Sequence, residues 1–228
     1  MFYIYHHLGL GDHIICNGLV RHFLEKYKKV SLFCHDHYKE NIRYLYRDEK
    51  NVNILPYKNE ANILKFLSKI DKNNYIKIGF EKLGEYDNQS NMTFDEAFYD
   101  IANLDFNIRF DKFFIKRDLE KEKYVLNCLN PKEEKYIYVH DDLNRKFSIN
   151  PNKHRNDLKI IKNDFRFNLF EMILLLKNAE EIHTMRTGML DLINSFKLKN
   201  TKIYVHEYVR NYGNFVHSKG LNKVTSIL

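Results

Sequence analysis

Short apolar runs alternate with amphipathic segments along the chain, and this alternation restricts the fold more than any other feature of the sequence. Apolar residues recur at every fourth position from Ile15 to Tyr27, which predicts a helix that opens at Asp12. Runs typical of buried strands surround it, at residues 1–7, 30–34, 52–56 and 75–79. The order strand, helix, strand predicts an α/β fold with a parallel sheet flanked by helices, and ligands bind beyond the carboxyl ends of such strands.

The alternation stops at a polar stretch, residues 84–92, and then starts again. A capping box at Thr93–Glu96 predicts one helix, and Arg117 to about Leu129 is expected to form another. Four further strands are expected at residues 136–140, 158–161, 181–185 and 202–205, the last of them being the final strand. A chain of 228 residues has room for two small domains, and we place them at residues 1–118 and 119–228.

The first apolar run ends in a turn, His6–His13, that contains two glycines. Glycine lets bare backbone approach a ligand, and the helix that follows presents its positive end, so the turn suits a phosphate or a sugar. It is not a dinucleotide-binding fingerprint, because the third glycine would fall on Ile14, and no Lys-Ser/Thr pair follows for a P-loop. NAD binding and ATP hydrolysis are therefore disfavoured.

Two strand ends in the second half carry arginines. Arg145 follows the strand at residues 136–140, and the turn Arg186-Thr187-Gly188 joins the strand at residues 181–185 to a helix at residues 189–196. Arginine matches phosphate oxygens through paired contacts, so both positions suit a diphosphate. Their structural alternative is an ordinary surface ion pair.

These motifs resemble those of GT-B glycosyltransferases, and most closely the family 9 heptosyltransferases of lipopolysaccharide synthesis. Those enzymes open with a strand that runs into G-x-G-D-x-I, matched here by Gly9, Gly11, Asp12 and Ile14. Late in the chain they carry a helix ending in alanine, a short strand and a Ser/Thr-x-x-Gly turn, which Ala179, residues 181–185 and the turn to Gly188 resemble. The chain is shorter than a typical member.

The resemblance implies two Rossmann-like domains in the GT-B arrangement, with the acceptor bound by residues 1–118 and the nucleotide-sugar donor by residues 119–228. It also implies an inverting, metal-independent hexosyl or heptosyl transfer in which Asp12 is the catalytic base. Gly9, Gly11 and His13 would lie on the acceptor side. The acceptor would be a glycan, a glycolipid or another hydroxyl compound, and no cofactor beyond the nucleotide-sugar substrate is expected.

The chemistry fits these residues independently. An inverting transfer needs a base for the acceptor hydroxyl and positive charge for the departing diphosphate. Asp12 supplies the base, and the donor side is expected to consist of Arg145, Arg186, Thr187 and Gly188. The structural alternative for Asp12 is a helix N-cap, and for each histidine of the turn it is a satisfied core position.

Metal sites are disfavoured. Cys34-His35-Asp36-His37 does not supply a tetrahedral ligand set, and the pair Asp141-Asp142 after a strand is more typical of turn capping than of cation binding. The three cysteines form no C-x-x-C pair and are expected to be reduced and buried.

The net charge of +7 favours anionic partners without choosing among them. No apolar run is long enough for a membrane span, so we expect a cytoplasmic protein for which only peripheral membrane contact is open. Two alternatives to glycosyl transfer remain: a non-catalytic module that binds nucleotides or sugar phosphates, and a basic nucleic-acid-binding protein. The second would use the aromatic and basic segment from Phe106 to Lys116, although its phenylalanines are better explained as core.

Overall fold

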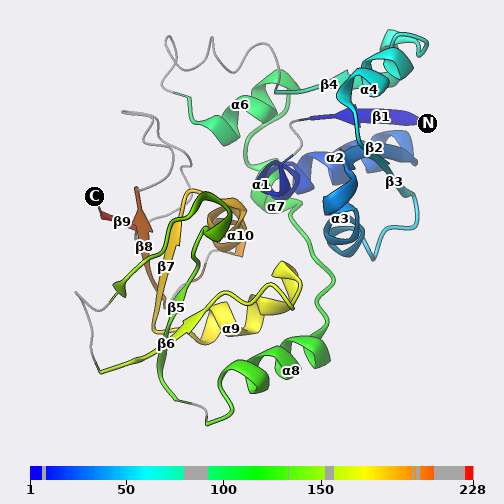
Figure 1. Cartoon of the computed structure of the whole chain (residues 1–228). Helices are drawn as coiled ribbons and strands as arrows, with labels where there is room; N and C mark the ends of the chain where they lie inside the picture. The colour runs from blue at the N-terminus through cyan, green and yellow to red at the C-terminus, as the bar shows by residue number, and fades with distance from the viewer. Residues whose placement is uncertain are drawn as a thin grey trace. The chain divides into compact units, whose positions relative to one another are not determined.

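A computed structural model describes residues 1–6, 9–79, 92–132, 134–151, 157–196, 198 and 201–207, together with the backbone of residues 224–227 (Figure 1). Up to residue 207 the chain divides into two compact units between Lys116 and Arg117. His7 and residues 80–91, which include most of the expected polar stretch, lie outside the described residues.

The N-terminal unit is built on a parallel sheet of four strands in the order β3-β2-β1-β4. The strands are β1 (Phe2–Tyr5), β2 (Val30–His35), β3 (Val52–Tyr57) and β4 (Tyr75–Lys77). The apolar runs therefore form the strands that their patterns predict. Pro56 lies within β3, which is tolerated because β3 is an edge strand.

Helices connect these strands and follow them along the chain. They are α1 (Leu10–Ile15), α2 (Asn17–Tyr27), η1 (Asp36–Tyr38), α3 (Lys39–Leu45), α4 (Glu60–Leu67), η2 (Lys72–Asn74), α6 (Phe94–Ile101) and α7 (Ile108–Asp111). Ile15, Leu19 and Phe23 are buried, so the fourth-position repeat marks the core face as predicted. The predicted capping box is present, because Glu96 accepts the Thr93 backbone N–H at 2.7 Å.

The first helix differs from the prediction in two respects. It begins at Leu10 rather than after Asp12, and it is interrupted at Cys16, whose backbone (φ −80°, ψ 3°) separates α1 from α2. Periodicity could not detect the interruption, because Ile15 and Leu19 stay buried on both sides of it.

Gly18 explains how α2 and α7 pack. A Cβ atom at Gly18 would lie 2.3 Å from the backbone oxygen of Ile108, so only glycine allows this approach. The next residue on α7, Arg109, is fully buried and forms an ion pair with Asp95 of α6. Arg109 is therefore part of the core and not of a nucleic-acid-binding surface.

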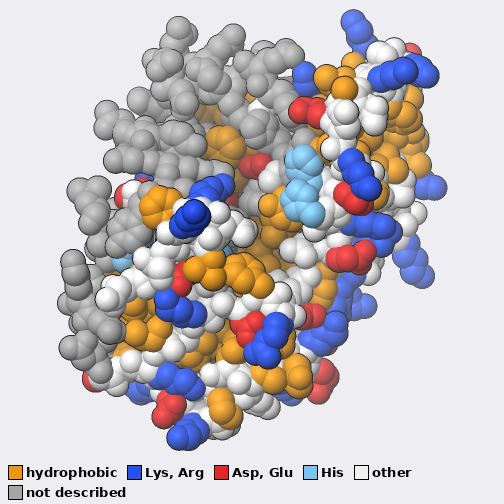
Figure 2. Space-filling model, viewed as in Figure 1, with side chains coloured by type: hydrophobic (Ala, Val, Ile, Leu, Met, Phe, Trp, Pro, Cys, Tyr) orange, Lys and Arg blue, Asp and Glu red, His pale blue; other side chains and the backbone are white. Residues whose placement is uncertain are grey.

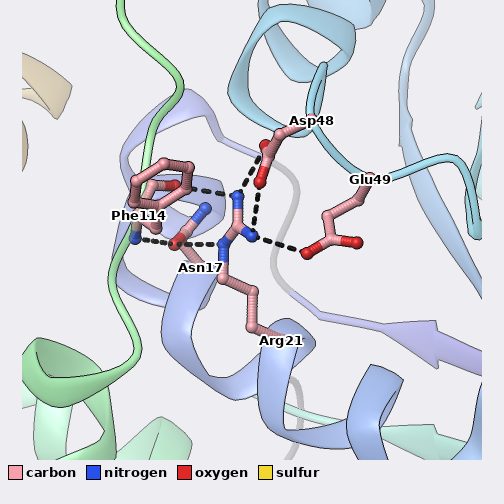
Figure 3. Close-up of polar contacts among 5 residues, drawn as sticks. All are labelled: Asn17, Arg21, Asp48, Glu49 and Phe114. Atoms are coloured by element: carbon pink, nitrogen blue, oxygen red, sulfur yellow. Dashed lines mark hydrogen bonds and ion pairs between the residues drawn. The ribbon is translucent and has the colours of Figure 1, made fainter.

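Arg21 of α2 anchors the segment that leaves the N-terminal unit (Figure 3). Its guanidinium forms three contacts of 2.9 Å, two with Asp48 and one with Glu49, and donates to the backbone oxygen of Phe114 at 3.0 Å. Asn17 accepts the Phe114 N–H at 3.0 Å. This network holds residue 114 against α2, two residues before the division at Lys116.

The C-terminal unit contains a parallel sheet of five strands in the order β6-β5-β7-β8-β9. Its strands are β5 (Tyr136–Val139), β6 (Lys159–Lys162), β7 (Glu181–Met185), β8 (Lys202–His206) and β9 (Val224–Ile227). The other elements are α8 (Leu119–Leu129), η3 (Leu143–Arg145), η5 (Leu169–Met172), α9 (Ile173–Asn178) and α10 (Gly188–Phe196). The prediction that β8 is the final strand is wrong, since β9 pairs with it. The sequence did not reveal β9 because this strand has only four residues, two of which carry hydroxyl groups, and so contains no apolar run.

The fold class predicted from the sequence is confirmed to the extent of two parallel α/β sheets flanked by helices. The GT-B arrangement and the assignment of residues 1–118 and 119–228 to acceptor and donor stay predictions. Within the described ranges, every helix is too short or too polar to cross a membrane. Cys16 and Cys34 are buried as expected, whereas Cys128 is exposed because it lies on the outer side of α8.

Candidate active site

The order of the strands places one candidate ligand-binding edge in each unit. In the N-terminal sheet, β2 and β3 extend to one side of β1 and β4 lies on the other, so the order reverses beside β1. In the C-terminal sheet it reverses between β5 and β7. Open parallel sheets bind ligands beyond the carboxyl ends of the strands at such reversals. We call these the first edge (His6, Gly9–His13 and His35) and the second edge (Asp141–Arg145, Lys162, Arg186–Gly188 and Glu207).

Asp12 lies at the first edge as the third residue of α1, not as its N-cap. Gly9 is the N-cap, and its backbone N–H donates to Oδ2 of the Asp12 carboxylate at 3.0 Å. A Cβ atom at Gly9 would lie 2.9 Å from that same oxygen. Gly9 therefore allows the carboxylate to fold back over the turn, and Asp12 and Gly11 are both half-buried.

His13 is placed in the core rather than on an open surface. Its side chain is completely buried, and its ring packs edge-on against the buried ring of His6 with centroids 4.4 Å apart. Neither ring nitrogen of His13 has a hydrogen-bond partner among the described residues. Burial, and then the neighbouring His6 and His35, lower the pKa of His13 well below its usual value, so the ring is neutral. The structural alternative fits this position better than direct acceptor contact.

Imidazole and phenol rings also gather where β2 and β3 end. The His35 ring stacks on that of His37 at 5.2 Å and lies 5.2 Å from that of Tyr57. Cys34 is buried, which raises the pKa of its thiol to about 11. The described residues contain no group of three or more His, Cys, Asp or Glu side chains that could hold a metal ion.

At the second edge, Asp141 and Asp142 shape the loop that carries Arg145. Asp141 is buried and accepts the Ile149 N–H at 2.7 Å and Lys162 Nζ at 2.7 Å. Asp142 accepts the Arg145 N–H at 3.2 Å and pairs with its guanidinium at 2.5 Å. Both aspartates thus organise the turn, as their structural alternative predicts, and Arg145 remains exposed.

Arg186 follows β7 and forms a two-pronged ion pair with Glu207, which follows β8. Its Nε donates to Glu207 Oε2 at 2.6 Å and its Nη2 to Oε1 at 2.8 Å. Only 17% of the Arg186 side chain and 10% of the Glu207 side chain are exposed. Thr187 accepts the Leu190 N–H at its backbone oxygen, 2.9 Å away, and its buried Oγ1 has no partner among the described residues. Gly188 opens α10.

The structure thus brings the predicted donor residues to neighbouring strand ends, since β5 and β7 are paired and His140 N–H donates to the His183 oxygen at 2.8 Å. Sequence reasoning missed Lys162 and Glu207. Lys162 directly ends the expected strand at residues 158–161, and this position was the available signal. Glu207 gave none, because its partner Arg186 is 21 residues away and follows a different strand.

Buried histidines continue beneath the second edge. His183 Nδ1 and His206 Nε2 lie 2.9 Å apart across β7 and β8, and both side chains are buried. Burial lowers the pKa of His140, at the end of β5, to about 4 despite the adjacent Asp142 and Asp141. Buried histidine rings therefore lie at both edges.

No protein-family model matches the sequence, and no curated protein is significantly similar to it. Solved structures do match. The glycosyl transferase family 9 protein from Veillonella parvula superposes with a TM-score of 0.54 at 8% identity, over 99% of this chain and 85% of that one. The chain has the fold of that glycosyltransferase. E. coli ADP-heptose LPS heptosyltransferase II gives a TM-score of 0.52 at 11% identity, over 100% of this chain and 90% of that one. The resemblance stated from the sequence is therefore confirmed at the level of the fold.

Proposed function

We propose that this protein is a glycosyltransferase that moves a sugar from a nucleotide-sugar donor to a hydroxyl group of a glycan, glycolipid or similar acceptor. The transfer would be inverting and independent of a metal ion. One observation carries the proposal: the two arginine-bearing turns predicted for the donor lie at the ends of adjacent strands, where the order of the C-terminal sheet reverses. The glycosyltransferase fold of the structural neighbours agrees with it.

The second edge supplies the positive charge that the donor needs. Arg145, Lys162 and Arg186 each follow or end a strand at this edge, and Thr187 and Gly188 open a helix of nine residues. Cations and a helix N-terminus stabilise the charge that grows on a diphosphate as its bond to the sugar breaks. We assign these groups to the leaving nucleoside diphosphate.

Asp12 is assigned the role of base. In the proposed step its carboxylate takes the proton of the acceptor hydroxyl, the hydroxyl oxygen forms a bond to the anomeric carbon, and the bond from that carbon to the donor phosphate breaks. The electron pair of the broken bond leaves with the diphosphate, so the configuration inverts. The Gly9 N–H fixes the carboxylate in one orientation, which is what a base in a single displacement requires.

The test is turnover of a panel of nucleotide sugars by the purified full chain, followed as slow donor hydrolysis and as transfer to hydroxyl acceptors. We expect Asp12→Asn to lower transfer by roughly 10²- to 10⁴-fold, the usual contribution of a general base. Asparagine keeps an oxygen for the Gly9 N–H, so the melting temperature should stay unchanged. Asp71→Asn is the matched control, because Asp71 also accepts a backbone N–H, that of Asn73 at 2.8 Å.

Two results would count against the proposal. Full transfer activity in Asp12→Asn would remove Asp12 as the base. Absence of turnover with every donor, combined with binding of nucleotides, would favour the non-catalytic module. Strongly salt-dependent binding of a random oligonucleotide would instead favour the nucleic-acid-binding protein. The face drawn in Figure 2 gives that alternative little support, since acidic side chains are interspersed among the basic ones.

A further inference from the structure

The cations of the second edge are already paired with carboxylates. Arg145 pairs with Asp142 at 2.5 Å and Lys162 with Asp141 at 2.7 Å. Arg186 pairs with Glu207 through two contacts of 2.6 and 2.8 Å. A phosphate that binds to one of these cations through the same donor atoms must therefore compete with a carboxylate of the protein.

The three carboxylates differ in what else holds them. Asp141 accepts a backbone N–H and a hydroxyl, from Ile149 and Ser148, in addition to its lysine. Asp142 is the N-cap of η3, and its side chain accepts the backbone N–H of Arg145, the last residue of that helix. These two aspartates cannot leave without dismantling the loop after β5.

Glu207 is held by Arg186 alone. Among the described residues its carboxylate forms no other hydrogen bond or ion pair. The side chain of Glu207 is also one methylene longer than that of an aspartate, and the residue lies in the turn just after the last residue of β8. Glu207 is thus the one carboxylate of the three that can swing away without breaking any other described interaction.

The contacts of the Arg186 guanidinium match those that a phosphate group would make. A carboxylate and a phosphate each accept two parallel N–H bonds from one edge of an arginine guanidinium, so only one of them can occupy that edge at a time. The residue next to Arg186 offers a further donor, since the buried Oγ1 of Thr187 has no partner among the described residues.

We propose that Glu207 is a displaceable counter-ion, which holds Arg186 in the free protein and is exchanged for a diphosphate oxygen when the donor binds. This inference rests on the proposed function and adds a specificity-determining residue to it. Singly charged or neutral ligands cannot replace a carboxylate at a mostly buried guanidinium without loss, whereas a diphosphate can. Glu207 therefore selects for diphosphates over weaker anions.

The test is calorimetric titration of the full chain with inorganic pyrophosphate at fixed ionic strength. Glu207→Gln removes the competing charge, and we expect the dissociation constant of pyrophosphate to fall about tenfold. A tenfold fall corresponds to a wild type in which Glu207 has left Arg186 in about one molecule in ten. Glu207→Asp is one methylene shorter and cannot keep both contacts, so a smaller decrease is expected. The matched control is Glu180→Gln, because Glu180 forms an exposed ion pair with Lys135 at 3.1 Å. The affinity of this variant for pyrophosphate should equal that of the wild type.

The double variant Arg186→Gln/Glu207→Gln completes the design. It should lose the gain made by Glu207→Gln, because the gain acts through the guanidinium. Unchanged or weaker pyrophosphate binding in Glu207→Gln overturns the inference, as does a gain that survives in the double variant or an absence of binding in all proteins. Should Glu207→Gln fail to fold, the Glu207→Asp titration decides in the same way.

Failure of this inference can be told apart from failure of the proposed function. Nucleotide-sugar turnover by the wild type, together with unchanged pyrophosphate binding in Glu207→Gln, would remove the counter-ion and leave the transferase. Tighter pyrophosphate binding in Glu207→Gln without turnover of any donor would leave the counter-ion and remove the transferase.

Discussion

The first and second edges share a topology but differ in charge. Each lies at the carboxyl ends of parallel strands where the strand order reverses. The first edge is built from rings, with His6 and His13 completely buried and His35 stacked on His37. The second edge combines three cations with three carboxylates from the same edge. The strand order thus marks two candidate binding edges, and their side chains distinguish one from the other.

The comparison separates two kinds of recognition. An edge of imidazole rings with a single carboxylate on a glycine turn suits a hydroxyl group that must lose a proton. An edge of paired cations suits an anion that can replace one of the carboxylates.

Asp141→Ala should cost the most stability. The substitution leaves the Ile149 N–H and Lys162 without their buried acceptor, and we expect a loss of about 3 kcal/mol in the free energy of unfolding. Asp142→Ala, which removes only a cap and an exposed pair, should cost about 1 kcal/mol. Urea unfolding measures both. Equal losses in the free energy of unfolding for the two variants would contradict the view that Asp141 contributes more than Asp142 to the stability of the second edge.

The neutral histidines predict a loss of stability in acid. An unfolded histidine has a pKa of about 6.5, whereas the folded pKa of His13 is well below this and that of His140 is about 4. As the pH falls below about 6.5, the unfolded chain binds protons that the folded one does not, so stability is full above this pH and declines below it by up to ~1.4 kcal/mol per pH unit for each histidine.

His13→Leu isolates the first edge in this experiment. It removes a buried group that has no hydrogen bond among the described residues, so the variant should fold at least as stably as the wild type at pH 7.5. Between pH 7.5 and 5.5 it should lose about 1.4 kcal/mol less than the wild type. A His13→Leu profile identical to that of the wild type would show that His13 does not stay neutral.

Gly9→Ala should disturb the Asp12 carboxylate while leaving the fold intact. The backbone of Gly9 (φ −68°, ψ 153°) is open to alanine, but the new Cβ would meet Asp12 Oδ2 at 2.9 Å and push the carboxylate away. We expect kcat to fall about tenfold, which corresponds to about 1.4 kcal/mol, with little change in melting temperature. Gly11→Ala, for which no such close contact is found among the described residues, is the comparison variant. Unchanged kcat in Gly9→Ala would indicate that the orientation of Asp12 is unimportant.

Arg145→Gln should have the smallest effect on stability. Its side chain is 45% exposed and pairs with an aspartate three residues away, so we expect a change below about 0.5 kcal/mol. The KM for the donor should nevertheless rise several-fold with kcat retained, because a contact with the bound donor is lost. Arg166→Gln is the matched control, since Arg166 is also exposed and pairs with nearby Asp164 at 2.6 Å. A KM equal to that of the wild type would exclude Arg145 from the donor site.

Local patterns in the sequence determined the succession of elements. The apolar runs predicted every strand up to β8, and glycine with capping residues located the turns at Gly9 and Gly188. These features could be predicted because strand alternation, helical periodicity and capping depend on residues only a few positions apart. They also sufficed to place Arg145 and Arg186 at strand ends.

Only the fold determines which of these residues are exposed and which side chains they pair with inside the protein. It buried His13 and Arg109, interrupted the first helix at Cys16, and added β9 beside β8. It also neutralised Arg186 with Glu207, because β7 and β8 are neighbours and end at the same level of the sheet. Burial and ion pairing between strands depend on strand order and packing, which no local pattern contains, so the charge state of each edge could be known only from the fold.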